Sequence, residues 1–585
     1  MHLARFERIK QNSRASTSGS GSNAEPHAKR LKQPTIQEMI TDKHNLDLKV
    51  AEFLYATGVP LHIVRSPYFK EMCEEISRSY VPYSGPAYNA LRTTLLEQVK
   101  ARVSKACKPW EDHAREVTGF VLVSDGWTDA QHRPLINFLL TSPKGQKFLR
   151  AVDTSGETKD GKYIAAQLTA IMEEVGPEDV IAVIMDGASN NVSANQILME
   201  RFPWLFTLHC TAHSLDLACE KLGGFTYFKD HIAMGKKVIR VLTNHHFTSA
   251  LFKTQSKLFL LKPGDTRFYS AYIAVRRLLL CKNAVQKTVV STEWASWADK
   301  AEYKNKASTV SRIVLNASFW IALARFIILL RPIVRLLRLV DSNMPSMSKV
   351  YPECCEIEKH IQNVSLPADM NQEVADIFRD RWDKLHSPLH ALGYLLEPQF
   401  QGAKLGAEVK ADYRKALKKM LSSTEYTKAL SEITKFSNKE GVFGDPDIMS
   451  LTDENHPDHI PTYQFWAEYG DEVPTLSKVA QKVTAMTSSA GACERNWSAY
   501  DFIHCKKRNK LTPERANDLV FVFSNLRLMK KFKDPEKFAD WVSEIEPEQE
   551  EALLQEEGDE IELEEGEAAE ELADDSDVES AVDSD

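Results

Sequence analysis

The sequence predicts an α/β fold in which a strand-rich segment is followed by a long helical one. Between residues 117 and 209, runs of β-branched and apolar residues recur, which is the pattern of buried strands. From about 225 to 475 such runs nearly vanish, and apolar residues recur at helical spacing. Both ends of the chain are polar or acidic and lack the apolar content that a core requires. We therefore expect a mixed core, a helical insertion and disordered termini.

Five strands are expected in the mixed segment. Three of them follow one another at 117–123, 135–140 and 147–152, and a helix comes next. A strand at 180–185, a short helix and a strand at 205–209 complete the order. Three meandering strands followed by helix, strand, helix and strand is the order of an RNase H-like domain. In that topology the first and fourth strands lie side by side, so their carboxyl ends meet.

Three acidic residues are the candidate metal ligands. Asp125 and Asp186 close the first and fourth strand runs, within SDGWTD and MDGASNN, and Glu494 lies 308 residues further on in a helical segment. Carboxylates are ligands that Mg²⁺ and Mn²⁺ prefer, and two such ions roughly 3.5–4 Å apart serve phosphoryl transfer. The alternatives are Asp-Gly turns at strand ends and, for Glu494, a surface pair with Arg495. Asp129 is expected to cap or orient its turn.

The charge of the chain is divided unevenly. The formal net charge is −9, but Glu544 to Asp585 contains 21 acidic residues and no Lys or Arg. Without that segment, 61 acidic residues stand against 73 basic ones, which leaves about +12. A basic body favours a polyanionic partner such as DNA, because Lys and Arg neutralise phosphates. A soluble protein with a solvated acidic tail is the alternative.

Cysteine usage and hydropathy bear on location. The nine cysteines are scattered, and the start lacks the apolar core of a secretory signal, so a reduced intracellular protein is expected. The most apolar stretch, 319–340, contains four arginines and a proline, which predicts a buried helix and no membrane span.

Cys210 and His213 form half of a zinc ligand set, but no second half is suitably spaced, so structural zinc is not expected. The basic residues of 28–32 could serve nuclear import.

Several segments in order resemble the hobo/Activator/Tam-type (hAT) superfamily of DNA transposases, in its plant-type branch with a domain of unknown function around the first two acids. The resemblance extends from about Gln33 to Met529. The segments that carry it include FLYATGVPLHIVRSPYF at 53–69, SDGWTD at 124–129, IMDGASNN at 184–191, LHCTAHSLDL at 208–217, TRFYSAY at 266–272, RWDKLHSPLHALGYLLEPQF at 381–400 and, most strongly, ERNWSAYDFIHCKKRNKLTPERANDLVFVFSNLRL at 494–528.

The resemblance implies a domain organisation. An RNase H-like core would be interrupted by an all-helical insertion, and a C-terminal segment would mediate dimerisation. The expected parts are a disordered N-terminus at 1–44, a helical region at 45–115, the first part of the core at 116–224, the insertion at 225–475, the last part of the core with the dimerisation region at 476–533, and a disordered acidic tail at 534–585.

The resemblance also implies roles for individual residues. Asp125, Asp186 and Glu494 would hold Mg²⁺ or Mn²⁺ for cut-and-paste transposition in the nucleus. His213 would lie beside the active site, with a packed core histidine as the alternative. The other expected DNA contacts are Arg267, Phe268 (where Trp is usual), Lys506, Lys507, Arg508 and Lys510, with a solvated basic face as the alternative for the last four. The residues expected to dimerise are Trp497, Leu519, Val520, Phe523 and Leu526.

Two classes of function remain open at this point. Retention of all three acids favours an enzyme that hydrolyses and rejoins DNA. Family members commonly begin with a BED-type zinc finger, and nothing before residue 45 offers the paired cysteines and histidines of one. That favours a domesticated, non-catalytic scaffold that binds DNA and proteins. In both cases a homodimer or higher homo-oligomer is expected.

Overall fold

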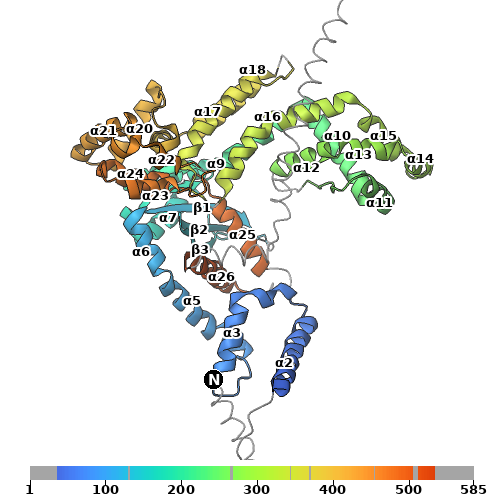
Figure 1. Ribbon diagram of the computed structural model, residues 1–585, viewed down its shortest axis with the longest axis horizontal. Helices are drawn as coiled ribbons and strands as arrows, with labels where there is room; N and C mark the ends of the chain where they lie inside the picture. The colour runs from blue at the N-terminus through green and yellow to red at the C-terminus, as the bar shows by residue number, and fades with distance from the viewer. Residues whose placement is uncertain are drawn as a thin grey trace, which may run out of the picture. The chain divides into compact units, whose positions relative to one another are not determined.

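The computed structural model of the chain describes residues 36–129, 132–263, 268–342, 344–367, 370–453, 455–504 and 511–533. These residues form two compact units (Figure 1). The first unit ends at Leu96 and also takes in Lys533, and the second extends from Glu97 to Phe532. The helical region expected at 45–115 is therefore divided between the two units. Of the termini expected to be disordered, 1–35 and 534–585 lie outside the described residues, whereas 36–44 belong to a helix that begins at Ile36.

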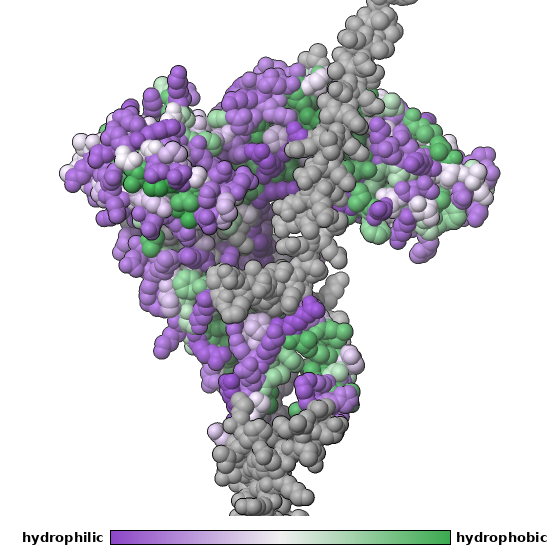
Figure 2. Space-filling view, viewed as in Figure 1, coloured by the Kyte–Doolittle hydropathy of each residue, from purple (hydrophilic) through white to green (hydrophobic). Residues whose placement is uncertain are grey.

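Prolines set the limits of the helices in the first unit. Its elements are α2 (Ile36–Thr57), η1 (Leu61–Arg65), α3 (Pro67–Arg78) and α4 (Tyr88–Arg92). Pro60 precedes η1 and Pro67 occupies the first position of α3, where a missing backbone N–H costs nothing. Many large apolar side chains of this unit remain exposed, and Figure 2 shows apolar surface upon it. They include Phe53, Tyr55, Leu61, Tyr80, Tyr83 and Tyr88.

A five-stranded mixed sheet lies at the centre of the second unit. Its strands are β1 (Phe120–Thr128), β2 (Pro134–Ser142), β3 (Gly145–Asp153), β4 (Val180–Met185) and β5 (Phe206–His209). The order across the sheet is β3-β2-β1-β4-β5. The first three strands are antiparallel, whereas β4 runs parallel to both β1 and β5. The expected adjacency of the first and fourth strands is thus confirmed.

Helices cover both faces of this sheet, which is why its central strands are continuous apolar runs. All six residues of β4 are buried, and so are the first five of β1. The helices nearest the sheet in sequence are α5 (Thr94–Ala106), α6 (Lys108–Val117), α7 (Gly161–Val175), α8 (Ser189–Arg201) and α9 (Thr211–Gly223). In α7 the apolar side chains at helical spacing, including Ile164, Leu168 and Ile171, are buried.

The region between α9 and residue 485 contains only helical elements among the described residues, as expected. The first group is α10 (Thr226–Asn244), α11 (His246–Gln255), α12 (Phe268–Leu280), α13 (Lys282–Val289), α14 (Thr292–Ala298), α15 (Lys304–Val314) and α16 (Ala317–Asp341). The second group is α17 (Met347–Asn363), α18 (Asn371–Leu385), α19 (Pro388–Leu396), η3 (Pro398–Phe400), α20 (Ala407–Met420), α21 (Ser423–Ser437), η4 (Gly441–Gly444), α22 (Pro446–Ser450), α23 (Thr462–Tyr469) and α24 (Pro474–Thr484). Helix α16 contacts members of both groups (Figure 1).

Helix α16 is also the one described helix that is long and apolar enough to cross a membrane by length and composition. Over half of its apolar window is buried inside the chain, against α9, α10, α12 and α17. Its arginines find protein partners: Arg325 donates to the Tyr227 hydroxyl, and Arg335 pairs with Glu353 at 2.7 Å. These contacts are those of a core helix, and they agree with the expectation from its sequence.

The chain returns to the sheet in its last two described helices, α25 (Gly491–Ile503) and α26 (Pro513–Lys533). Helix α25 packs on β1 and β2. Helix α26 contacts the edge strand β3 through two amide side chains. Asn525 accepts from Phe148 N and donates to Phe148 O, and Asn517 accepts from Ala151 N. Three backbone groups of the strand edge, at Phe148 and Ala151, are therefore satisfied within the chain.

Candidate active site

The two aspartates lie at the same level on neighbouring strands. The parallel register pairs Val123 of β1 with Ile184 of β4, and each aspartate is two residues further along its own chain. One correction to the sequence prediction arises here, because Asp125 does not close its strand. Pairing with the antiparallel neighbour β2 carries β1 on to Thr128, and Asp125 is paired with Asn137. An Asp-Gly turn is therefore excluded at Asp125, while Asp186 does follow the last residue of β4.

The Asp125 carboxylate faces helix α25. Its Oδ2 accepts a hydrogen bond from Trp497 Nε1 at 3.2 Å, and the Trp497 ring stacks on Trp127 at 4.9 Å between centroids. Burial raises the pKa of Asp125, and the negative charge of Asp186 raises it further. The Trp497 hydrogen bond and the nearby His213 act in the opposite direction. Burial and the neighbouring charge thus both disfavour the ionised form of Asp125, which a bound cation would stabilise.

The Asp186 carboxylate is oriented by the loop that follows β4. Its Oδ1 accepts hydrogen bonds from Ala188 N at 2.8 Å and from Asn191 Nδ2 at 2.7 Å. Both donors belong to the MDGASNN signature. A bond to the amide two residues ahead is the Asx-turn arrangement, and here it leads directly into α8. The signature thus fixes the rotamer of an acid that remains partly accessible to solvent.

Glu494 reaches the same region on the first turn of α25. Buried Asn137 donates through Nδ2 to the carbonyl of Cys493, so the residue paired with Asp125 is tied to the residue before Glu494. Three residues after Glu494, Trp497 binds Asp125. The elements that bear the three acids are therefore in contact. Among the residues that the structure describes, however, no three His, Cys, Asp or Glu side chains are grouped as a metal-holding cluster.

Strand β5 and helix α9 each bring one histidine to this edge of the sheet. His213 is exposed and close enough to influence Asp125, so the packed core histidine considered above is excluded. His209 ends β5 opposite Met185, the residue before Asp186, and burial lowers its pKa. Cys210 Sγ accepts hydrogen bonds from the backbone amides of His213 and Ala490. This thiol caps α9 and ties the helix to the segment that leads into α25.

Lys159 is a further charged residue of the site, and sequence reasoning missed it. Its ammonium lies near both Asp125 and Asp186, while burial lowers its pKa. A Cβ on Gly126 would lie 3.1 Å from Lys159 Nζ, so the glycine of SDGWTD leaves the space in which the ammonium sits. No sequence signal marks Lys159, because it comes from a polar loop before α7. Asn137 could have been found, since it is an isolated amide within the apolar run of β2.

Asp129, expected to orient its turn, does so through Arg133. The buried Asp129 carboxylate accepts from Arg133 N at 2.9 Å and from the guanidinium at 2.6 and 2.8 Å. This acid is therefore committed to a structural pair.

Most of the predicted DNA contacts fall in segments that the structure does not describe. Arg267, Lys506, Lys507, Arg508 and Lys510 lie outside the described residues, and of Phe268 only its place at the start of α12 is described. Of the predicted dimerisation residues, Trp497 and Val520 are buried within the chain's own core. Leu519, Phe523 and Leu526 pack partly against that core and retain some exposed surface.

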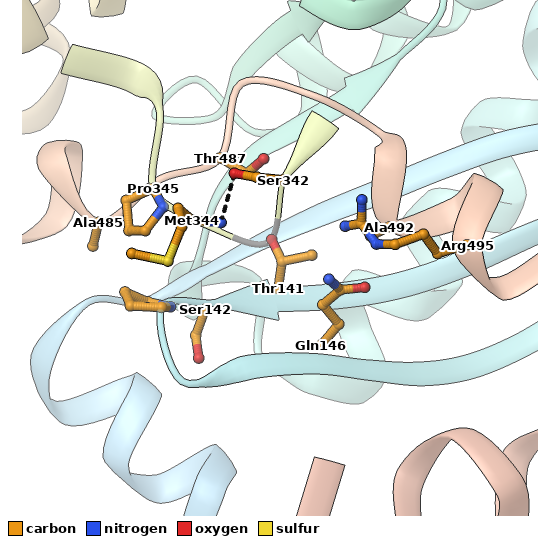
Figure 3. A pocket seen from close by; sticks show the side chains of 11 residues that line it. Thr141, Ser142, Gln146, Ser342, Met344, Pro345, Ala485, Thr487, Ala492 and Arg495 are labelled. Carbon is orange, nitrogen blue, oxygen red and sulfur yellow. Dashed lines mark hydrogen bonds between the residues drawn. The ribbon is translucent and has the colours of Figure 1, made fainter. Parts of the chain in front are cut away.

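A small hollow lies on the same face of the sheet, toward the other end of β2 (Figure 3). Thr141 shares this face with Asn137, since strand side chains alternate. Arg495, the residue after Glu494, points into the hollow and is its one charged lining residue. The full lining is Thr141, Ser142, Pro143, Gln146, Ser342, Met344, Pro345, Ala485, Thr487, Ala492 and Arg495. With no acid in its lining, this hollow is separate from the aspartate pair.

Two segments of the chain match known family models. Residues 86–238, which contain both aspartates, match a domain of unknown function (DUF659). Residues 442–526, which contain Glu494, match the hAT family C-terminal dimerisation region. No curated protein matches the chain. The two matches, in this order, support a hAT-family transposase-like protein. The dimerisation region supports a homo-oligomer.

Proposed function

We propose that the chain is a transposase, or a protein derived from one, that hydrolyses and rejoins DNA phosphodiesters at a metal site built on Asp125 and Asp186. The observation that carries the proposal is the position of these acids at one level on adjacent parallel strands. Glu494 would supply a third carboxylate from α25. The strand order and directions support an RNase H-like core, because they are those expected of such a core from the sequence.

The residues present fit hard divalent ions. Asp125 and Asp186 are oxygen ligands; burial, and then the charge of Asp186, raises the pKa of Asp125, and a bound cation would favour its ionised form. When bound, Mg²⁺ or Mn²⁺ would stabilise charge on the attacking and leaving oxygens of the phosphodiester. The chain itself would hold the acids in place: Trp497 and Asn191 orient one carboxylate each. Water would attack the phosphorus first and release a 3′-hydroxyl, which would then attack the target strand.

Nicking of supercoiled DNA with Mn²⁺ tests this proposal. Wild-type protein should nick, and Asp186→Asn should lower the rate by at least about a hundredfold, the scale on which single electrostatic groups act in catalysis. The asparagine keeps the acceptor for Ala188 and Asn191, so the fold is expected to survive. Asp129→Asn would be a poor control because it breaks a buried pair, whereas exposed Asp230→Asn in α10 leaves the acid pair and the loop that bears Lys159 untouched. If Asp186→Asn nicks at the wild-type rate, the assignment fails.

A non-catalytic scaffold that binds DNA and proteins is the second candidate. The specific observation in its favour is that the described residues do not group three acids into a metal-holding cluster. Full DNA binding with no nicking in Mg²⁺ or Mn²⁺ would establish this alternative. In either case we propose a nuclear location and DNA as the partner, because the basic body of the chain suits a polyanion.

A further inference from the structure

Two contacts fix the backbone around Lys159, and its side chain passes close to Gly126. Its carbonyl accepts a hydrogen bond from Asn190 Nδ2 at 3.2 Å, which links its loop to α8. The next residue, Asp160, caps α7 by accepting from Tyr163 N at 2.8 Å. The side chain then extends over the backbone of Gly126, where a Cβ would be too close to Nζ. Lys159 is thus a half-buried residue with a defined position, unlike a mobile surface lysine.

The Lys159 ammonium lacks a partner among the described residues. Asp125 and Asp186 both act on it electrostatically, yet within the described part of the chain no ion pair within 4.0 Å and no hydrogen bond involves Nζ. An ammonium offers three donors, and partial burial without an acceptor is costly. A lysine that served only to neutralise the acid pair would be expected to contact one of the carboxylates. Nζ instead lies more than 4.0 Å from both carboxylates, so its donors remain available to another group.

We propose that Lys159 binds a non-bridging phosphate oxygen of the DNA strand that enters the aspartate site. Such an oxygen carries negative charge and accepts from a compact cationic donor, which is how lysine binds phosphate elsewhere. Gly126 belongs to this arrangement, since a Cβ there would lie 3.1 Å from Nζ and push the ammonium back by a few tenths of an ångström. The inference rests on the proposed function, because it assumes that DNA is the substrate. It assigns Lys159 to substrate binding, and the acids to the metal ions.

Lys159→Met tests the inference, with Lys159→Arg as the conservative variant and Lys162→Met as the matched control. Lys162 is an exposed residue of the first turn of α7. Three quantities are measured: the rate of plasmid nicking with Mn²⁺, the affinity for free Mn²⁺ by electron paramagnetic resonance, and the salt dependence of binding to a short duplex in Ca²⁺. Lys159→Met should nick at least tenfold more slowly and lower the salt slope by about 0.9. Its Mn²⁺ affinity should be unchanged or higher, and Lys159→Arg should recover part of the rate.

Different results overturn the two proposals. If Lys159→Met keeps the wild-type nicking rate and salt slope, Lys159 does not bind phosphate, and the metal site stands. If the variant loses nicking together with Mn²⁺ affinity but keeps the salt slope, the lysine acts only on the acid pair, and the inference is wrong. If wild type binds DNA without nicking, the salt slope alone decides the role of Lys159. Undiminished nicking by Asp186→Asn overturns the proposed function itself.

Discussion

Trp497 and Asp125 are joined by an indole-to-carboxylate hydrogen bond of 3.2 Å although 372 residues separate them in the chain. The bond links the second family-matched region to the first, across the whole helical insertion. It also explains a feature of the ERNWS signature, in which Trp497 follows Glu494 by three residues. One helical turn places both side chains on neighbouring positions of α25, so the helix can fix Asp125 and present Glu494 together.

In Trp497→Phe, the loss of Mn²⁺ affinity that occurs on acidification should begin at a higher pH than in wild type. The indole N–H favours the ionised carboxylate, so its loss raises the already elevated pKa of Asp125. Protons then compete with Mn²⁺ for the carboxylate over a wider pH range above 3.8, the usual pKa of an aspartate. Mn²⁺ affinity measured between pH 4.5 and 7.5 should fall most at the acidic end and converge with wild type at the other. Trp127→Phe, which alters the stacked partner but not the hydrogen bond, is the control. Parallel pH curves for wild type and Trp497→Phe would refute this.

Asp125→Asn should stabilise the metal-free protein at neutral pH. Because the pKa of Asp125 is higher in the folded protein than in the unfolded chain, ionisation of Asp125 opposes folding. This destabilisation is fully present when the pH is above the folded-state pKa, and it is absent when the pH is below 3.8. The asparagine removes the charge and retains an acceptor for Trp497. Thermal unfolding in EDTA should therefore show a higher melting temperature than wild type at pH 7, with the difference shrinking toward pH 4. Each kcal/mol gained corresponds to about 2–4 °C or less in a chain of this size. Mn²⁺ should stabilise wild type only, and a lower melting temperature for the variant at pH 7 would be the contrary result.

The sequence predicted well where chain order constrains the fold, and poorly where distant side chains meet. The strand order and the adjacency of β1 and β4 followed from the order in which strand-like apolar runs and helical segments succeed one another along the chain. The end of β1 did not, because pairing of Asp125 with Asn137 depends on β2 rather than on local residues. Lys159 was missed for a similar reason: its loop is polar like any other, and only tertiary contacts with Asn190 and Gly126 bring it to the acids.

The dimerisation residues illustrate a second limit of sequence reasoning. An apolar helix face predicts burial but does not say whether the covering surface comes from the same chain or from a partner. Val520 proves to be buried in its own chain, whereas Phe502 at the end of α25 is 69% exposed and lies 6.2 Å from Phe523 between ring centroids. The exposed aromatic pair, and not Val520, is available to a partner.

Phe502→Glu should therefore weaken self-association. A charge placed on an exposed aromatic contact must be desolvated on association, and the dimer dissociation constant should rise at least tenfold. Light scattering across a concentration series measures this, and circular dichroism confirms that the helical content is retained. Phe259→Glu is the matched control, because that ring is 62% exposed but belongs to the insertion, outside the matched dimerisation region. Equal molar masses for wild type and Phe502→Glu at every concentration would exclude this surface as the interface.

Asn525→Ala should destabilise the second unit more than its neighbour Asn517→Ala. Asn525 is fully buried and satisfies both the N–H and the C=O of Phe148, at 3.0 and 2.9 Å, whereas Asn517 satisfies only Ala151 N. A buried polar group left without a partner costs about 1–3 kcal/mol, so the loss should be about 2–6 kcal/mol for Asn525 and half that for Asn517. Urea unfolding followed by tryptophan fluorescence gives both values. Hydrogen exchange of the Phe148 amide supplies the mechanism-specific readout, since that amide should exchange faster in Asn525→Ala and not in Asn517→Ala. If the two variants lose equal stability and the Phe148 amide stays protected, α26 is held to the edge of the sheet by its apolar contacts alone.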